Sequence, residues 1–284
     1  MARPFRIVNV FTVDGDPFSG NPLCVVEDAR GLSTEQMQAI ARQMNLSETT
    51  FVLPAQAGGV AHVRIFTPGF EMPFAGHPTL GTAFVIANGR TAVTLEMKAG
   101  HVPVTIGGSL LTLRAARAPT TRPMDATRAE VAAMLGLPLG ALPDDPTLAP
   151  LWVNTGVEQL VIPLTSVEHV RATKPVLALI EKHGFSAARD EAMAYVWARG
   201  EREWEVRFFF TSNGALLEDP ATGSACANLG GYLLARAATL PLSAMLLQGA
   251  AISRPSRLGL IVDAEPAIYV SGTAMEVGRG TLAI

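Results

Sequence analysis

The chain has 284 residues, a length typical of about two domains and sufficient to bury a core without disulfides or metals. Its net charge is −3, only 17% of its residues are charged, and no basic run occurs, which argues against nucleic acid as a partner. The two cysteines, Cys24 and Cys226, are too few for a disulfide framework and fit a reducing compartment. Because the N-terminal residues lack the apolar core of a signal peptide, we expect a cytoplasmic protein.

One apolar stretch, 229–252, has to be weighed as a membrane span. It carries a single charge, Arg236, but Pro241 interrupts it and the Gly230-Gly231 pair weakens it as a helix. A span needs about 20 continuous apolar residues. We therefore expect a buried helix, a break and a second buried element, and no membrane partner.

Alternation and capping signals organise the N-terminal part of the chain. Residues 5–12 alternate between polar and apolar, as a half-buried strand does, and a short apolar strand is expected at 23–26. Ser33 and Gln36 form the signature of a capping box, so a helix should begin there. Residues 48–53 then predict another strand.

Three strand-like runs follow, separated by turns at 99–100 and 107–108. Glycine pairs between alternating runs are typical of hairpins because tight turns need positive φ. The stretch 117–123, rich in proline and threonine, reads as a linker. A second capping box, Thr127 with Glu130, predicts a short helix.

The second half predicts strands near 151–154 and 159–164 and a helix over 175–183. A hairpin is expected around Gly200, and about the last forty residues read as antiparallel strands. Strands interrupted by isolated helices indicate an α+β fold with mostly antiparallel sheets.

An internal repeat is the most informative feature of the sequence. The run VRIF at 63–66 is followed by HPTLGTA at 77–83, and VRFF at 206–209 is followed by DPATGSA at 219–225. Aligned without a gap, the two heptapeptides share x-P-x-x-G-[Ser/Thr]-Ala. We therefore expect two copies of one domain, each with a strand, a loop and a helix.

The repeat also predicts where a ligand binds. Each helix is expected to enter at a glycine followed by a hydroxyl cap, Thr82 in the first copy and Ser224 in the second. A helix N-terminus attracts anions, so the two copies together suggest a site for a small carboxylate. The residues that head the heptapeptides, His77 and Asp219, should then face the same site.

Glu48 is the third candidate residue. It enters a strand among apolar neighbours, which should raise the pKa of its carboxyl group towards neutrality, as a proton-transferring acid/base needs. Glu71 and Glu218 flank the two repeated motifs, and the sequence does not rank them below Glu48.

With NLSETTF, GHPTLGTA and EDPATGSA in order, the chain resembles the PhzF-like isomerases of the phenazine biosynthesis group. That family is similar in fold to diaminopimelate epimerase. The resemblance implies an α+β fold of two similar, pseudo-symmetric domains, each a mostly antiparallel sheet wrapped around a central helix. It implies an N-terminal domain over 1–118, to which a final strand at 272–284 returns, a C-terminal domain over 119–271, and a homodimer.

The resemblance also implies an activity, a cofactor-independent isomerisation of a small carboxylate-bearing substrate such as a dihydro-aromatic amino acid. The family's acid/base glutamate falls on Glu48, and its histidine and aspartate fall on His77 and Asp219. Substrate-binding positions are implied at Ser47, Gly76, Gly223 and Ser224. No cofactor and no metal are implied, and the substrate and pathway stay open.

Other classes of function remain as alternatives. Cys226 lies close to Ser224, so a two-cysteine racemase or epimerase can be written, and so can a hydrolase using Ser224, His77 and Asp219, although no G-x-S-x-G surrounds the serine. Histidine spacings typical of metal sites and glycine motifs typical of nucleotide sites are missing from the sequence. A catalytically inactive ligand-binding module is the third alternative, and proton exchange would distinguish it from an isomerase.

Overall fold

The computed structural model of the chain describes residues 2–115 and 117–284. These residues form two compact units, the first built from two separate segments of the chain and the second from one continuous segment. The first unit contains the residues up to Arg114 together with Ser271–Ile284, and the second contains Ala115–Val270.

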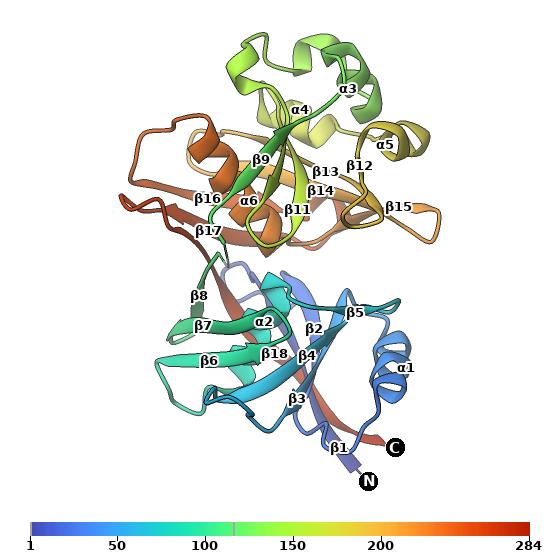
Figure 1. Cartoon of the computed structure of the whole chain (residues 1–284), viewed down its shortest axis with the longest axis vertical. Helices are drawn as coiled ribbons and strands as arrows, with labels where there is room; N and C mark the ends of the chain where they lie inside the picture. Colours follow the sequence, from blue (N-terminus) through green and yellow to red (C-terminus); the bar gives the residue numbers. More distant parts are fainter. Residues whose placement is uncertain (1, 116) are drawn as a thin grey trace. The chain divides into compact units, whose positions relative to one another are not determined.

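The first unit alternates strands with two helices (Figure 1). Its elements are β1 (Ala2–Val10), β2 (Asn21–Val26), α1 (Thr34–Met44), β3 (Glu48–Leu53), β4 (Ala61–Phe66), β5 (Glu71–Met72), α2 (Gly76–Ile86), β6 (Ala92–Met97), β7 (Gly100–Gly107) and β8 (Leu110–Arg114). The long strand β18 (Ile268–Ala283) begins in the second unit, and most of its length belongs to the first.

The strands of the first unit form a closed ring. Antiparallel pairs join β1 to β2, β3 to β4, β6 to β7 and β7 to β8, and parallel pairs join β2 to β3 and β4 to β6. The ring closes because β18 pairs with both β1 and β8. Helix α2 packs against strands from all around this ring, and it is apolar and buried along most of its length. A β-carbon on Gly81 would lie 2.5 Å from Leu23 Cδ2, so the close approach of helix and strand requires glycine there.

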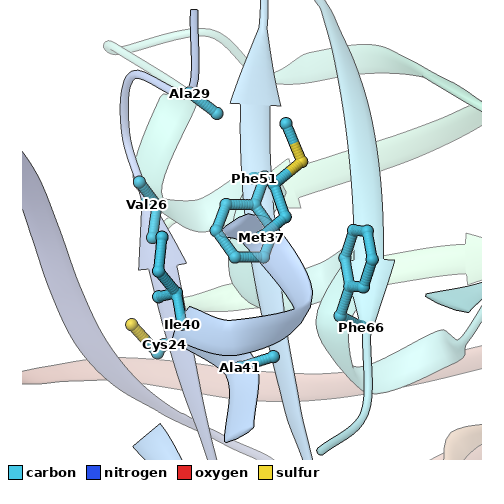
Figure 2. Close-up of a cluster of buried hydrophobic side chains, with 8 residues drawn as sticks. All are labelled: Cys24, Val26, Ala29, Met37, Ile40, Ala41, Phe51 and Phe66. Carbon is cyan, nitrogen blue, oxygen red and sulfur yellow. The ribbon is translucent and has the colours of Figure 1, made fainter. Parts of the chain in front are cut away.

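Helix α1 covers the other face of the same sheet. Figure 2 shows Met37 and Ile40 of α1 among the buried side chains of the strands beneath, including Cys24 of β2, Phe51 of β3 and Phe66 of β4. Successive residues of a strand point to opposite faces. The strand residues immediately before and after each one that contacts α1 therefore point towards α2.

The second unit contains more helices (Figure 1). Its elements are β9 (Thr120–Pro123), α3 (Arg128–Leu135), β10 (Leu151–Asn154), β11 (Glu158–Pro163), α4 (Val167–Ala172), α5 (Leu177–His183), β12 (Phe185–Ser186), β13 (Glu191–Ala198), β14 (Trp204–Ser212), β15 (Ala215–Asp219), α6 (Gly223–Ala235), β16 (Leu242–Gln248) and β17 (Ser256–Val262). Helix α6 packs against β9, β10, β11 and β17.

The pairing scheme of the first unit recurs in the second. The pairs β10–β11, β13–β14, β14–β15 and β16–β17 are antiparallel, whereas β11–β13 and β14–β16 are parallel. This is the order and sense of β1–β2, β3–β4, β4–β5, β6–β7, β2–β3 and β4–β6. The residues of these paired strands can therefore be matched between the units by strand register.

Strand register corrects the alignment of the repeat. Phe66 of VRIF pairs with Glu71, and Phe209 of VRFF pairs with Glu218. The strands of the β14–β15 hairpin extend further beyond this pair than those of the β4–β5 hairpin, so more residues separate Phe209 from Glu218 than Phe66 from Glu71. A gap is therefore required, and the two heptapeptides are not equivalent. The matching segments are EMPFAG, which starts at Glu71, and EDPATG, which starts at Glu218. Each ends at the glycine that begins the central helix.

Three further predictions were wrong. The predicted linker at 117–123 contains the exposed strand β9, which pairs antiparallel with β10. Thr82 does not cap a helix start, because α2 begins at Gly76 and Thr82 lies inside it. Its hydroxyl donates to the Pro78 carbonyl and is also hydrogen-bonded to the Thr50 hydroxyl. Nor is Ser224 the cap of α6, whose N-cap residue is Thr222.

The local signals are confirmed where they depended on short-range chemistry. Ser33 with Gln36 and Thr127 with Glu130 both form complete capping boxes at the starts of α1 and α3. The apolar stretch 229–252 divides between the end of α6 and strand β16. Among the described residues, no helix has the length and apolar character that a membrane crossing requires.

Candidate active site

Glu48 and His77 meet inside the first unit. Glu48 is the first residue of β3 and His77 lies in the first turn of α2. Phe51 points towards α1, so Glu48 lies on the opposite face with Thr50, whose hydroxyl is hydrogen-bonded to that of Thr82 of α2. His77 Nδ1 lies 3.2 Å from Glu48 Oε2, with 4% of the His77 side chain and 15% of the Glu48 side chain exposed.

Burial keeps His77 neutral. It lowers the pKa of the imidazole to about 3, and a hydrogen bond to the Pro22 carbonyl only partly opposes this effect. Near neutral pH the imidazole therefore sits beside the Glu48 carboxyl group without a positive charge. The Nε2 atom of His77 is buried and has no hydrogen-bond partner among the described residues.

The other predicted positions of the first unit lie next to this pair. Ser47 is half-buried and immediately precedes β3. Gly76 is buried and begins α2, whose N-cap residue Ala75 has no side chain that could accept from the first amides. The start of α2 therefore presents backbone N–H groups beside His77.

Asp219 is the last residue of β15, and Gln248 at the end of β16 holds the loop that follows it. Gln248 Nε2 donates to the Asp219 carbonyl at 2.9 Å and to Thr222 Oγ1 at 3.0 Å, while its Oε1 accepts from the Thr222 amide at 3.2 Å. The Thr222 hydroxyl then donates to Asp219 Oδ2. Sequence reasoning missed Gln248, because it lies far from the motif along the chain.

Gly223 and Ser224 form the first turn of α6. Gly223 is buried and Ser224 is half-buried. The side chain of Ser224 is held from one side, where Gln159 Nε2 donates to its Oγ at 3.0 Å. The sequence gave no signal for Gln159, since it lies on β11 and meets the helix only through the fold.

Glu71 and Glu218 have structural partners. Arg64 Nε lies 2.7 Å from Glu71 Oε1 and its Nη2 lies 2.8 Å from Oε2, and Arg207 binds Glu218 in the same bidentate way at 2.9 and 2.7 Å. Each arginine is the R of a V-R-x-F motif and lies over the phenylalanine of that motif, at 5.0 Å from the ring of Phe66 in the first unit.

We call these two ion pairs the latches. Arg64 holds the pKa of Glu71 below its usual value, so this carboxyl group stays ionised and paired. Such a group is a poor proton-transferring base. Of the three candidate glutamates, Glu71 and Glu218 are each paired with an arginine. Glu48 is therefore the better candidate for a base.

Apart from the latches, the two units differ at the candidate positions. Phe51 of β3 pairs with Arg64 and Val196 of β13 pairs with Arg207, so the equivalent of Glu48 is the buried Met193. Counting from the latch glutamates, the equivalent of His77 is Ser224, and that of Asp219 is Met72. The first unit holds the Glu48 carboxyl group beside the His77 imidazole. In the second unit the Asp219 carboxyl group accepts from the Thr222 hydroxyl.

The cysteines do not match a two-thiol mechanism. Cys24 lies in the cluster beneath α1, on the face of β2 opposite to α2, and burial raises the pKa of its thiol to about 12 (Figure 2). Cys226 is fully buried in α6, and burial raises the pKa of its thiol as well. The equivalent of Cys226 in the first unit is Thr79, so the two thiols are not related by the repeat. Buried thiols of this kind are inert.

A family model described as phenazine biosynthesis-like protein (PhzC-PhzF) matches residues 8–280. The chain belongs to the PhzF family. An isomerase from Pasteurella multocida is 40% identical over 98% of this chain and 93% of its own length. The trans-2,3-dihydro-3-hydroxyanthranilate isomerase of Pseudomonas aeruginosa is 35% identical over 97% of this chain and 98% of its own length.

The solved structures agree with this assignment. A PhzF-family phenazine biosynthesis protein from Bacillus anthracis superposes with a TM-score of 0.85 at 26% identity, covering 100% of both chains. Like these relatives, the chain is an isomerase. The resemblance drawn from the three sequence motifs is thereby confirmed, together with the mixed α and β character of the fold.

Proposed function

We propose that the protein is a cofactor-independent isomerase that moves a proton on a small carboxylate-bearing molecule, with Glu48 as general acid/base. The observation that carries the proposal is the contact between Glu48 Oε2 and His77 Nδ1 at 3.2 Å in a buried part of the first unit. The relatives named trans-2,3-dihydro-3-hydroxyanthranilate isomerase support a dihydro-aromatic amino acid as the substrate class.

In this mechanism the Glu48 carboxylate takes a proton from a C–H bond of the substrate. The electron pair left behind shifts into the conjugated system, and the carboxylic acid formed on Glu48 returns the proton to another carbon, so no atom is gained or lost. His77 supports this cycle because it is neutral. An imidazolium at this distance would stabilise the carboxylate and weaken it as a base.

The other predicted positions bind the substrate in this proposal. His77 and Asp219 orient it, and Ser47, Gly76, Gly223 and Ser224 hold its carboxylate through hydroxyl groups and the backbone amides of helix starts. The shared pairing scheme supports a further proposal, that the two units are duplicated domains, each with its sheet around a central helix. We also propose that the protein is cytoplasmic and forms a homodimer. Light scattering of the purified protein would test the dimer.

The test of the activity is deuterium exchange. Wild type should incorporate deuterium from D₂O into trans-2,3-dihydro-3-hydroxyanthranilate or a related unsaturated amino carboxylate, and Glu48→Gln should lower the rate by about a hundred- to ten-thousandfold. The amide keeps the size of the side chain but cannot accept the proton. Binding and melting temperature should change little.

Glu35→Gln provides the matched control, because Glu35 is an exposed glutamate in the first turn of α1. Full exchange by Glu48→Gln would overturn the assignment of the base and direct attention to Asp219. Wild type that binds these amino carboxylates without exchanging deuterium would favour the inactive ligand-binding module instead.

A further inference from the structure

A buried chain of side-chain amides connects the backbone of the second unit to Ser224. Asn228 Oδ1 accepts from the Thr155 amide at 2.9 Å and from the Thr155 hydroxyl at 2.7 Å. Asn228 Nδ2 donates to the Val157 carbonyl and to Gln159 Oε1, both at 2.8 Å, and Gln159 Nε2 donates to Ser224 Oγ at 3.0 Å. Asn228 and Gln159 are 0% and 1% exposed.

The backbone fixes the direction of every hydrogen bond in this chain. The Thr155 N–H can only donate, so the oxygen of Asn228 must face it, and the Val157 carbonyl can only accept, so the nitrogen of Asn228 must face that. Asn228 Nδ2 then requires an acceptor on Gln159. The remaining end of the Gln159 amide is the nitrogen, which has to donate to Ser224.

The consequence for Ser224 is a hydroxyl with one defined role. Its oxygen accepts from Gln159, so its own proton points away from Gln159. We propose that Gln159 and Asn228 are positioning residues that orient the Ser224 hydroxyl as a donor to the carboxylate of the substrate. This inference rests on the proposed function, in which Ser224 contacts that carboxylate.

The first unit shows that packing alone does not require this amide chain. The equivalent of Asn228 is Gly81, and strand register makes Leu23 the equivalent of Gln159. There an apolar contact joins the central helix to the strand. Burying two amides costs free energy unless every polar atom is satisfied, so their presence on one side only indicates a local task. That side is the one with Ser224 in place of His77.

Binding of anthranilate tests the inference, because this ligand carries the carboxylate and amine on an aromatic ring that has no labile ring C–H proton. Gln159→Leu should weaken binding in calorimetry by about ten- to a hundredfold, the size expected for one misaligned hydrogen bond to a charged group. Gln159→Glu should weaken it at least as much at neutral pH, because an ionised carboxylate would accept the Ser224 proton. Lowering the pH should restore affinity in Gln159→Glu alone, since a protonated carboxyl group can donate again.

A double-mutant cycle separates positioning from general damage. In a Ser224→Ala background, Gln159→Leu should have less than about a twofold further effect on affinity. Thr173→Val is the matched control, because Thr173 is also buried in the second unit and its hydroxyl donates to the His169 carbonyl. That variant should lose stability without losing affinity, and melting temperatures should be recorded for all variants.

The outcomes are distinguishable. Unchanged affinity in Gln159→Leu, together with weakened binding in Ser224→Ala, would overturn the positioning role and leave the proposed function intact. An equal loss from Gln159→Leu in both backgrounds would show that Gln159 acts on the fold and not through Ser224. Wild type that neither binds anthranilate nor exchanges deuterium would overturn the proposed function and the positioning role together.

Discussion

The two units share their framework and differ in their chemistry. Both have the same strand pairings, and both hold a V-R-x-F arginine against the glutamate of an E-x-P-x-x-G segment. Where the first unit has Glu48 the second has Met193, and His77 is matched by Ser224. What recurs is therefore the scaffold of each unit, and the proposed reaction assigns its catalytic roles to positions at which the two units differ.

The largest expected effect concerns the latches. Arg207→Met should lower the free energy of unfolding by about 3–5 kcal/mol, because it leaves Glu218 as an unpaired charge with only 8% of its side chain exposed. Arg207 also donates to the carbonyls of Val170, Arg171 and Thr173, which would lose that partner. Urea unfolding provides the measurement.

The latch of the first unit is more exposed than that of the second. Arg64→Met should cost clearly less, because the side chains of Arg64 and Glu71 keep 20% and 23% of their exposure and water screens the remaining charge. Replacing both Arg207 and Glu218 by methionine should recover much of the loss. Equal losses for the two single variants would contradict the difference in burial.

A smaller effect concerns acid stability, which should depend on the first unit through His77. The unfolded chain binds a proton on this histidine below its ordinary pKa of 6.5, whereas the folded chain does so only near pH 3. The free energy of unfolding should therefore fall as the pH drops below 6.5, by up to about 1.4 kcal/mol per pH unit. Urea unfolding between pH 7 and 4.5 should show a shallower slope for His77→Gln, and the same slope as wild type would refute the buried neutral imidazole.

The smallest effect is expected for the cysteines, which are not equivalent between the units. Cys226→Ala should change the exchange rate by less than about threefold and the free energy of unfolding by about 1 kcal/mol. Alkylation with iodoacetamide should be slow for Cys24 and Cys226 until urea unfolds the chain, because burial raises the pKa of both thiols. A loss of activity by several orders of magnitude would instead favour the two-cysteine mechanism.

Sequence reasoning succeeded where the determinants are local. The capping boxes at Ser33 and Thr127 and the turns between β6, β7 and β8 depend on a few neighbouring residues, and the structure contains all of them. The repeat was detected, but its register was wrong, because a match without gaps hid the longer strands of the β14–β15 hairpin. The signal that would have corrected it was present, since E-x-P-x-x-G follows V-R-x-F in both halves.

The candidate site was less accessible to sequence reasoning. His77 was selected from the repeat and Glu48 from its apolar neighbours, and the family resemblance then implied their roles. No spacing in the chain indicates that the two side chains lie 3.2 Å apart. Gln159 and Gln248 could not be found at all, because each reaches its partner from a distant strand. Such contacts follow from strand order and register, which one sequence read by periodicity does not determine.

The closed ring of the first unit has a consequence for synthesis on the ribosome. Ala2 of β1 pairs with Ala283 of β18, so the ring joins the earliest and latest strands of the described chain. A nascent chain that has just produced β8 still has an open sheet with two unpaired edges. The unit made first is therefore completed last, and its edges stay available for wrong pairings while the second unit is being translated.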